Sequence, residues 1–408
     1  MSRRDGTQGT DTAGTGGSAR EYDVVLYGAT GFVGALTAEY LAAHAPRDLR
    51  WALAGRGLPR LERLRAERLA PGHPHTADLP LLTAEADDPA ALAELARSAR
   101  VVVNCAGPYI HHGQALVAAC AEAGTDYLDL AGEPEFVDLM YVRHDARARE
   151  TGARLVHCCG FDSVPHDLGV LYTVRQLPPD VPLRVDGFVR VGATFSGGTL
   201  ASALTAASRG RQTLAAARDR RRHEPRLVHR RVNTAPPTPR YAPEVGAWAL
   251  PLPTVDPEVV RQSARALERY GPDFRYRHYA AVRRLPVAVG WVAAVGALVT
   301  AAQIPPVRRG ISGRLAPGEG PNEGRRARSW FSVRFVGEGG GRRVFTEVSG
   351  GDPGYGETAK ILAEAALSTA LDDLPDTAGQ VTPATAMGDA LTTRLRSAGI
   401  TFRVAAHR

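Results

Sequence analysis

The glycine triplet that follows the opening apolar run is the feature that most restricts what this chain can fold into. In DVVLYGATGFVGALTAEYLAAH, Gly28, Gly31 and Gly34 lie between a predicted strand and a predicted amphipathic helix. The first glycine permits a tight turn, the second lets the backbone approach a pyrophosphate, and the third lets helix and strand pack closely. Free N–H groups at the helix start would then hold the anion, whereas the alternative is a structural turn without a ligand. The residues predicted to contact a dinucleotide here are Gly28, Thr30, Gly31, Phe32, Val33 and Gly34.

Strand and helix patterns alternate after this turn. Apolar strands are predicted in WALAGR (51–56), ARVVVNCAGPY (99–109) and DYLDLAG, and QALVAACAEAG predicts a helix ending at Gly124. Such alternation is typical of a parallel, doubly wound sheet. We therefore predict an α/β Rossmann domain over residues 21–168, preceded by a disordered tail at 1–20 that is rich in Gly, Thr and Ser.

The end of the second predicted strand indicates which dinucleotide binds. NAD-dependent enzymes usually place an acid there, which binds the ribose 2′-hydroxyl, but this chain has Arg56 and, one helical turn later, Arg60. A guanidinium forks onto a 2′-phosphate, so NADP(H) is favoured; the alternative is that Arg56 caps the strand in solvent. Tyr109 either reaches the nicotinamide or packs in the core. The other residues predicted to line the cofactor crevice are Asn104, Ala106, Gly107 and Pro108.

The pattern changes in the second half of the chain. RVDGFVRVGATFSGG suggests longer alternating strands, and RSWFSVRFVGEGGGRRVFTEVSGG indicates a hairpin around Gly339–Gly341. We predict a second, α+β domain built on an antiparallel sheet over 169–380, with a basic and Pro-rich excursion at 209–245 and an uncharged apolar segment at 285–302. The closing segment, 381–408, is expected to pack back on the first domain.

The chain resembles the saccharopine dehydrogenase-like oxidoreductases in seven motifs: GATGFVG, AGR, NCAGPY, CCGFDSVPHDLG, FSGGTLAS, ARSWF and VSGGDPGYGETAK. Within that group it is most similar to the trans-acting enoyl reductases of actinobacterial polyketide and glycolipid pathways, over about residues 22–405. The resemblance implies an NADPH-dependent reductase of an α,β-unsaturated acyl thioester, carried by a polyketide synthase that lacks its own reductase. One departure is Glu85, which stands where the family more usually has Asp.

Lys360 is the only lysine in a chain with 50 Lys and Arg residues. The pattern ETAKILAEAALSTAL predicts a helix with Lys360 in its first turn, where a cation is mildly unfavourable. Enoyl reduction leaves an enolate that the site must stabilise and protonate. Lys360 would act there or beside a cofactor phosphate; the alternative is an exposed residue without a role. Tyr355 is the rival proton donor, and Asp162, Ser163 and His166 are weaker candidates.

Two unusual segments suggest partners. Residues 209–231 hold nine arginines, which would contact anionic lipid, dock an acidic acyl-carrier domain or form a solvated loop. The 285–302 segment predicts a buried or lipid-contacting helix rather than a true membrane span. FSGGTLAS (195–202) would admit a phosphopantetheine arm or simply begin a helix. A net charge of +7 is weak evidence for a nucleic-acid partner, because arginine is enriched throughout and aromatic residues make up only 6%.

The four cysteines show no zinc-site spacing, so we predict no metal and a reduced, cytoplasmic chain, with peripheral attachment to the inner face of the plasma membrane as a further expectation. Two other functions stay open. One is a non-catalytic NADP-bound protein that organises lipid, and the other is a C–N oxidoreductase acting on an amino acid. The sequence leaves the oligomeric state open.

Overall fold

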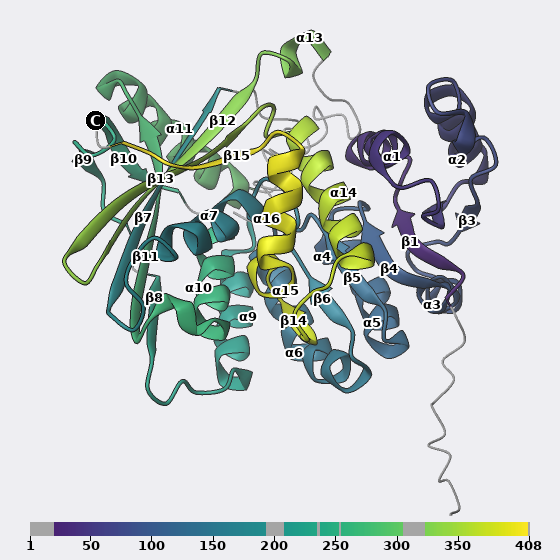
Figure 1. Ribbon diagram of the computed structural model, residues 1–408, viewed down its shortest axis with the longest axis horizontal. Helices are drawn as coiled ribbons and strands as arrows, with labels where there is room; N and C mark the ends of the chain where they lie inside the picture. Colours follow the sequence, from purple (N-terminus) through teal and green to yellow (C-terminus); the bar gives the residue numbers. More distant parts are fainter. Residues whose placement is uncertain (1–19, 193–207, 235–236, 253, 305–322, 407–408) are drawn as a thin grey trace, which may run out of the picture.

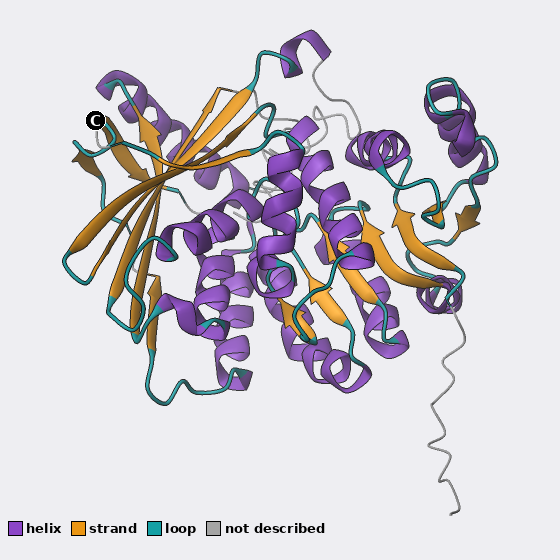
Figure 2. Ribbon diagram, in the orientation of Figure 1, coloured by secondary structure: helices purple, strands orange, loops and turns teal. Residues whose placement is uncertain are grey.

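Two β-sheets lie at opposite sides of the molecule, with helices between them (Figures 1 and 2). The computed structural model describes residues 20–406, apart from 193–207, 235–236, 253 and 305–322. The predicted tail at 1–20, except for Arg20, and the FSGGTLAS motif lie outside the described residues.

The first sheet has seven strands, and each pairs in parallel with its neighbours. The strand order is β14-β6-β5-β4-β1-β2-β3, so the chain winds outward in both directions from β1 and β4. This arrangement confirms the Rossmann prediction. The strands are β1 (Tyr22–Tyr27), β2 (Trp51–Gly55), β3 (Leu81–Thr83), β4 (Ala99–Asn104), β5 (Asp126–Asp129), β6 (Arg154–Val156) and β14 (Gly379–Val381).

Helices cover both faces of this sheet, because its strands carry apolar residues on both sides. Leu26 and Val101 face one core, which includes α1 and α14, whereas Val25 and Val102 face the other, which includes α3, α5 and α6. The helices of this part of the chain are α1 (Phe32–His44), α2 (Leu58–Arg63), α3 (Pro89–Ser98), α4 (Tyr109–His112), α5 (Gln114–Ala123) and α6 (Pro134–Thr151), with helical turns at Leu64–Leu69 and Pro74–Thr76.

The second sheet has eight strands and is mostly antiparallel, as predicted, with parallel pairs at one strand. Its main path runs β15-β13-β12-β7-β11-β10-β9, and β11 pairs in parallel with both β7 and β8. The parallel pairs arise because helical segments separate β7 from β11, which lets the chain return in the same direction. The predicted hairpin is confirmed, with Gly340 and Gly341 in its turn. The strands are β7 (Leu183–Gly192), β8 (Arg231–Thr234), β9 (Arg240–Ala242), β10 (Ala247–Pro251), β11 (Asp273–Val282), β12 (Trp330–Gly339), β13 (Arg342–Gly350) and β15 (Thr401–Val404).

The chain returns to the first sheet earlier than the predicted boundary at residue 380. Helix α14 packs on α1, β4 and β5, and β14 then becomes the outermost strand beside β6. Helix α16 packs on α14, and β15 finally joins the second sheet, so the closing segment contacts both units. Figure 1 shows α14 and α16 between the two sheets. These helices, with α7 and the short connecting ones, are α7 (Val164–Val174), α10 (Asp256–Ala266), α13 (Glu323–Arg326), α14 (Gly356–Leu371), α15 (Pro383–Ala386) and α16 (Gly388–Ser397), with a helical turn at Glu268–Tyr270.

The two unusual segments form helices. The basic segment begins with α9 (Gly210–His223), which packs on α6, so its first half is a docked helix and not a free excursion. The apolar segment is α11 (Leu285–Gln303), which contacts β10 and β11. By length and composition α11 could cross a membrane, and only 12% of its most apolar window is buried inside the protein.

Candidate active site

The turn between β1 and α1 has no space for side chains at two of its glycines. Gly28 has a φ of +77°, and a Cβ atom there would lie 2.8 Å from the Ala106 nitrogen. A Cβ atom on Gly34 would lie 2.3 Å from the Gly28 oxygen, so helix and turn touch directly. Gly31 occupies the N-cap of α1 without a capping side chain. The amide groups of the first helical turn, Phe32 to Gly34, are therefore left for an anion.

Arg56 lies at the carboxyl end of β2, next to this turn. Its side chain is exposed, as is that of Glu85 after β3. Both charges act on the Tyr27 hydroxyl at the end of β1: burial chiefly raises the pKa of Tyr27, Glu85 raises it further, and Arg56 lowers it. Arg56 and Glu85 thus share the edge of the sheet at which a dinucleotide binds. The arrangement fits a 2′-phosphate beside Arg56.

Asn104 holds the loop that follows β4 in place. Asn104 is buried, donates to the Tyr127 hydroxyl (2.9 Å) and accepts from the Ala106 nitrogen (2.8 Å). Its side chain is thus occupied within the protein, and it supports the loop instead of being free for a ligand. Gly107 and Pro108, joined by a cis peptide bond, are exposed.

Tyr109 belongs to the core. Its hydroxyl donates to the Asn104 carbonyl (3.0 Å) and accepts from the Leu130 nitrogen (3.2 Å). Burial raises the pKa of Tyr109 well above its usual value. Of the two sequence alternatives, the structure supports packing, because both hydrogen-bonding directions of the hydroxyl are taken by backbone groups.

The start of α14 brings the residues around the single lysine to the glycine turn. Tyr355 precedes the helix and is only 5% exposed, and its ring meets the Phe32 ring edge-on, with centroids 4.7 Å apart. Its buried hydroxyl has no hydrogen-bond partner among the described residues. Lys360 forms an ion pair with Glu357 (2.9 Å), one turn earlier in the helix. Asp352 accepts from the Gly356 nitrogen, so acidic groups balance the lysine at this helix start.

The loop that joins β6 to α7 completes this edge. Asp162 is exposed and lies beside Gly132, which follows β5. Surrounding protein and the nearby Asp256 raise the pKa of Asp162 to about 6. Ser163 is buried and donates to Asp256 (3.3 Å). A carboxyl group that is partly protonated near neutral pH can deliver a proton to a neighbouring carbanion.

Behind this loop lies a buried cluster that the sequence did not predict. His166 Nδ1 and His278 Nε2 lie 3.3 and 3.4 Å from the two oxygens of Asp256, and Tyr276 contacts the other nitrogen of His278 (2.8 Å). Burial lowers the pKa of His166 to about 4. His166, Asp256 and His278 could together hold a metal ion. Asp256 and His278 were missed because they begin an ordinary helix and sit in an alternating strand, and only the fold brings them together.

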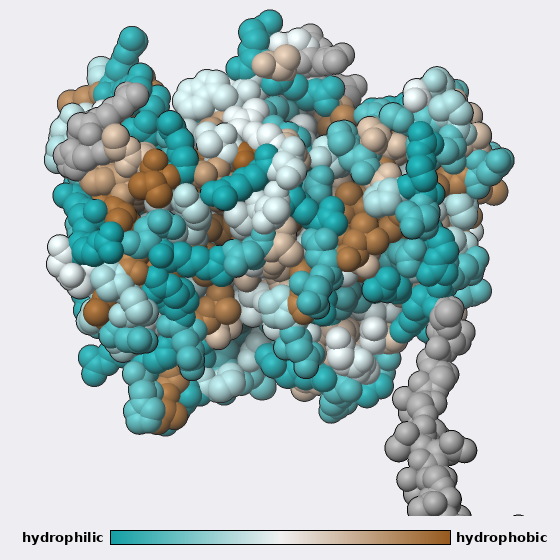
Figure 3. All heavy atoms as spheres, viewed as in Figure 1, coloured by the Kyte–Doolittle hydropathy of each residue, from teal (hydrophilic) through white to brown (hydrophobic). Residues whose placement is uncertain are grey.

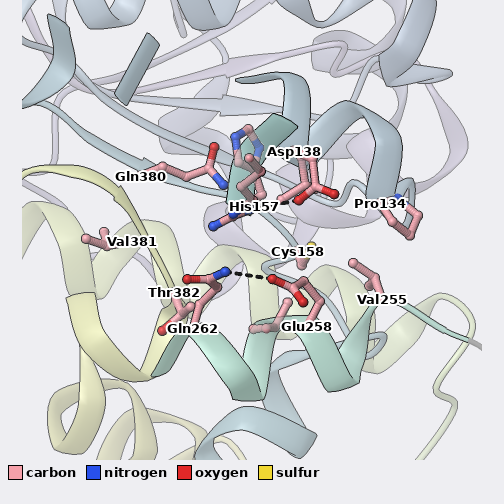
Figure 4. Close-up of a pocket in the computed structure, with 13 residues that line it drawn as sticks. Pro134, Asp138, His157, Cys158, Val255, Glu258, Gln262, Gln380, Val381 and Thr382 are labelled. Atoms are coloured by element: carbon pink, nitrogen blue, oxygen red, sulfur yellow. Dashed lines mark hydrogen bonds and ion pairs between the residues drawn. The ribbon is translucent and has the colours of Figure 1, made fainter. Parts of the chain in front are cut away.

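A small cavity is lined by residues of α6, α10 and β14 and by those that follow β6 (Figure 4). Its volume is about 30 Å³, enough for a water molecule but not for a substrate. Asp138 pairs there with Arg220 from α9, and burial raises the pKa of Asp138 to about 6. Figure 4 shows the hydrogen bond between Gln262 and Glu258 (2.6 Å) at its other wall. We assign this cavity to packing.

The parallel sheet with its glycine turn, joined to a mixed second sheet, is a fold of the saccharopine dehydrogenase type, and its first part matches an NADP-binding domain. Residues 24–156 match the family model described as saccharopine dehydrogenase NADP binding domain. The solved structure of apo saccharopine dehydrogenase (L-Glu forming) from Saccharomyces cerevisiae shares the fold, with a TM-score of 0.51 and 12% identity over 94% of this chain and all of that one.

Curated relatives define the family more narrowly. The chain is 40% identical to a Mycobacterium tuberculosis protein whose name assigns it provisionally to the trans-acting enoyl reductases, over 94% of this chain and 97% of the relative. It is 36% identical to the trans-acting enoyl reductase of Mycobacterium leprae, over 93% of this chain and 97% of the relative. The protein belongs to the family of these mycobacterial enoyl reductases.

Proposed function

We propose that the protein reduces the carbon–carbon double bond of an α,β-unsaturated acyl thioester in polyketide or glycolipid biosynthesis. The reaction adds a hydride to the β carbon and a proton to the α carbon, so an enoyl thioester, NADPH and one proton give the saturated thioester and NADP⁺. The names of the relatives describe them as trans-acting, and we infer that the substrate arrives on a separate acyl-carrier protein. Family membership supports the reaction, and the glycine turn supports its cofactor.

The cofactor site is built from residues of the first sheet. The free amides at the start of α1 would hold the diphosphate, and the exposed Arg56 would hold the 2′-phosphate. Bound NADPH supplies the hydride. Gly107 and Pro108 would form the wall of the crevice next to the reacting end.

Tyr355 is our proposed proton donor, and its unpartnered buried hydroxyl is the observation that carries this assignment. A buried hydroxyl without a hydrogen bond is costly, so a native protein usually keeps one for a ligand or for chemistry. The ring contact with Phe32 keeps the hydroxyl beside the glycine turn. Once the β carbon has gained its hydride, the Tyr355 O–H would give its proton to the α carbon or hydrogen-bond to the enolate oxygen.

Two further charged residues, Lys360 and Asp162, would support the reaction at Tyr355. Lys360 is the fifth residue of α14, just past the first turn in which the sequence placed it, and is paired with Glu357, so we propose that it tunes the local charge and does not donate the proton itself. Asp162, with its raised pKa, is the alternative donor.

Replacing the tyrosine hydroxyl tests this proposal. Tyr355→Phe keeps the ring on Phe32, and we expect kcat for NADPH oxidation with a 2-enoyl thioester to fall by about 10²-fold or more, because a general acid contributes on that scale. The affinity for NADPH, measured by fluorescence titration, should stay unchanged. Tyr241→Phe, at an exposed tyrosine, is the matched control.

Three outcomes would speak against parts of the proposal. A wild-type rate for Tyr355→Phe would move the donor to Asp162, to be tested with Asp162→Asn. Stoichiometric NADPH binding without turnover of any enoyl thioester would favour a non-catalytic, lipid-organising protein. Acceleration of NADPH oxidation by amino acid substrates and not by thioesters would favour C–N chemistry.

A further inference from the structure

Helix α11 consists almost entirely of apolar residues, and most of its described side chains are exposed. It contains no charged residue, and of its hydrophobic residues with described side chains only Ala288 and Ala302 are buried. Val292, Ala293 and Ala294 are all exposed, and successive helical residues point about 100° apart, so more than one face is bare. Hydrophilic residues are the most frequent on the face seen in Figure 3, with smaller hydrophobic patches among them, whereas α11 exposes Leu285, Val287, Val289 and Val292. A helix of this kind needs an apolar environment around it.

The fold prevents α11 from crossing a bilayer. Strand β11, before the helix, and strand β12, after it, belong to the same sheet and therefore lie on the same side of any membrane. The connection from residue 305 to residue 329 would have to cross back, but it carries six arginines and two glutamates. A lipid surface could therefore take up the helix only from one side, with the helix lying along it.

Basic and aromatic residues gather at the start of α11. Arg283 and Arg284 precede the helix directly and are exposed. Arg190 lies over the ring of Trp330, 5.5 Å from its centroid, and Trp330 is 41% exposed. Burial and then the neighbouring charge of Arg283 lower the pKa of Arg190, which places these residues in one group. Arginine attracts anionic lipid headgroups, and tryptophan prefers the interface between headgroup and hydrocarbon.

We propose that α11 lies in the surface of an anionic lipid bilayer, with Arg283, Arg284 and Arg190 against the headgroups. Lipid fits better than a second copy of the chain, because a rigid partner protein would cover one face of the helix, whereas lipid chains can pack against several faces of a helix at the bilayer surface. At about 1.5 Å per residue the helix is roughly 28 Å long, so it presents a large apolar area to the membrane. This inference concerns where the protein sits and does not depend on the reaction proposed above.

Vesicle flotation of the full-length protein tests it. We expect the wild type to float with phosphatidylcholine vesicles that contain phosphatidylglycerol, and less with phosphatidylcholine alone or at high salt. Val287→Asp combined with Val289→Asp should lower the partition coefficient by more than about tenfold. These valines are 56% and 62% exposed, so the fold should survive; the matched control is Val228→Asp, at an 82% exposed valine outside α11, which should bind as the wild type does.

Charge reversal separates the electrostatic contribution to vesicle binding from the hydrophobic one. Arg283→Glu combined with Arg284→Glu should weaken binding to anionic vesicles and leave the weak binding to neutral ones unchanged. NADPH titration of every variant shows that the Rossmann domain is intact, so failure here is distinguishable from failure of the reductase proposal. Wild-type protein that stays soluble with all vesicles would overturn the inference. So would an oligomer, seen by light scattering, that the Val287/Val289 double variant splits into monomers while no form of the protein binds vesicles.

Discussion

Arg56 owes its proposed role to its place at one strand end and to the groups around it. It stands exposed at the carboxyl end of β2, where an acid would bind a ribose hydroxyl instead. Among the described residues no carboxylate forms an ion pair with Arg56, so its charge is available to a phosphate. Gly28, by contrast, matters because it has no side chain. Its positive φ and its close approach to Ala106 leave no room for one.

We predict that Arg56→Asp reverses the cofactor preference. The carboxylate would repel a 2′-phosphate and accept from a 2′-hydroxyl, so Kd for NADPH should rise by about 10- to 100-fold while Kd for NADH falls or stays the same. Because the site is exposed, the free energy of unfolding should change by less than about 0.5 kcal/mol. Fluorescence titration of both nucleotides measures the ratio.

Arg63→Asp is the control for this charge reversal, since Arg63 is an exposed arginine of the neighbouring helix α2. It should leave the preference unchanged. If Arg56→Asp binds NADPH as tightly as the wild type does, another group recognises the phosphate and Arg56 merely faces solvent.

At the scale of elements, helix α9 shows how buried charges can hold a helix in place. Arg220 is almost fully buried; it pairs with Asp138 of α6 (3.1 Å) and Glu224 (3.0 Å), and it lies over the Tyr141 ring at 4.4 Å. Arg209, just before the helix, forms a two-pronged pair with Glu135. Arg209 and Arg220, which belong to a segment that the sequence suggested to be a basic surface, thus form ion pairs that attach α9 to α6.

We predict that Arg220→Ala destabilises the protein by about 3–5 kcal/mol, because it leaves the buried Asp138 carboxylate without its cation, whereas Glu224 keeps its ion pair with Arg261 (2.8 Å). Urea denaturation followed by circular dichroism measures the change. Arg221→Ala, one residue later and exposed, should cost less than about 0.5 kcal/mol. Equal effects of the two substitutions would show that α9 is not anchored by this pair.

Only some of the elements of this fold could be predicted from the sequence. Strands β1, β2, β4 and β5 of the first sheet and the hairpin were predictable, because each depends on a local pattern: an apolar run, a glycine turn or alternation. The place of β14 and the parallel pairs of β11 were not, since they depend on pairings between segments far apart in the chain. Among the candidate site residues, Gly28 and Arg56 were predicted from their position after a strand, whereas Asp256 and His278 carry no local signal.

At the scale of the whole molecule, one hydrophobic core passes from the first sheet into the second. Leu26 and Val101 of the first sheet belong to the same buried cluster as Phe335 and Val348 of the second, with residues of α7, α14 and α16 between them. The chain also passes from one sheet to the other more than once, at β7, α14 and β15. Neither sheet could unfold without exposing the core of the other.

We therefore predict one cooperative unfolding transition that both sheets share. Two variants would each retain a single tryptophan, either Trp51 in β2 or Trp248 in β10, with phenylalanine at the other three positions. Their fluorescence midpoints in urea should coincide. NADPH at about 100 times its Kd should raise the free energy of unfolding reported by each tryptophan by the same amount, about 2.7 kcal/mol. The two values should agree because both sheets unfold in the transition that ligand binding opposes. Two separate midpoints, or a shift with NADPH at Trp51 alone, would show that the sheets unfold independently and that α14 does not connect them energetically.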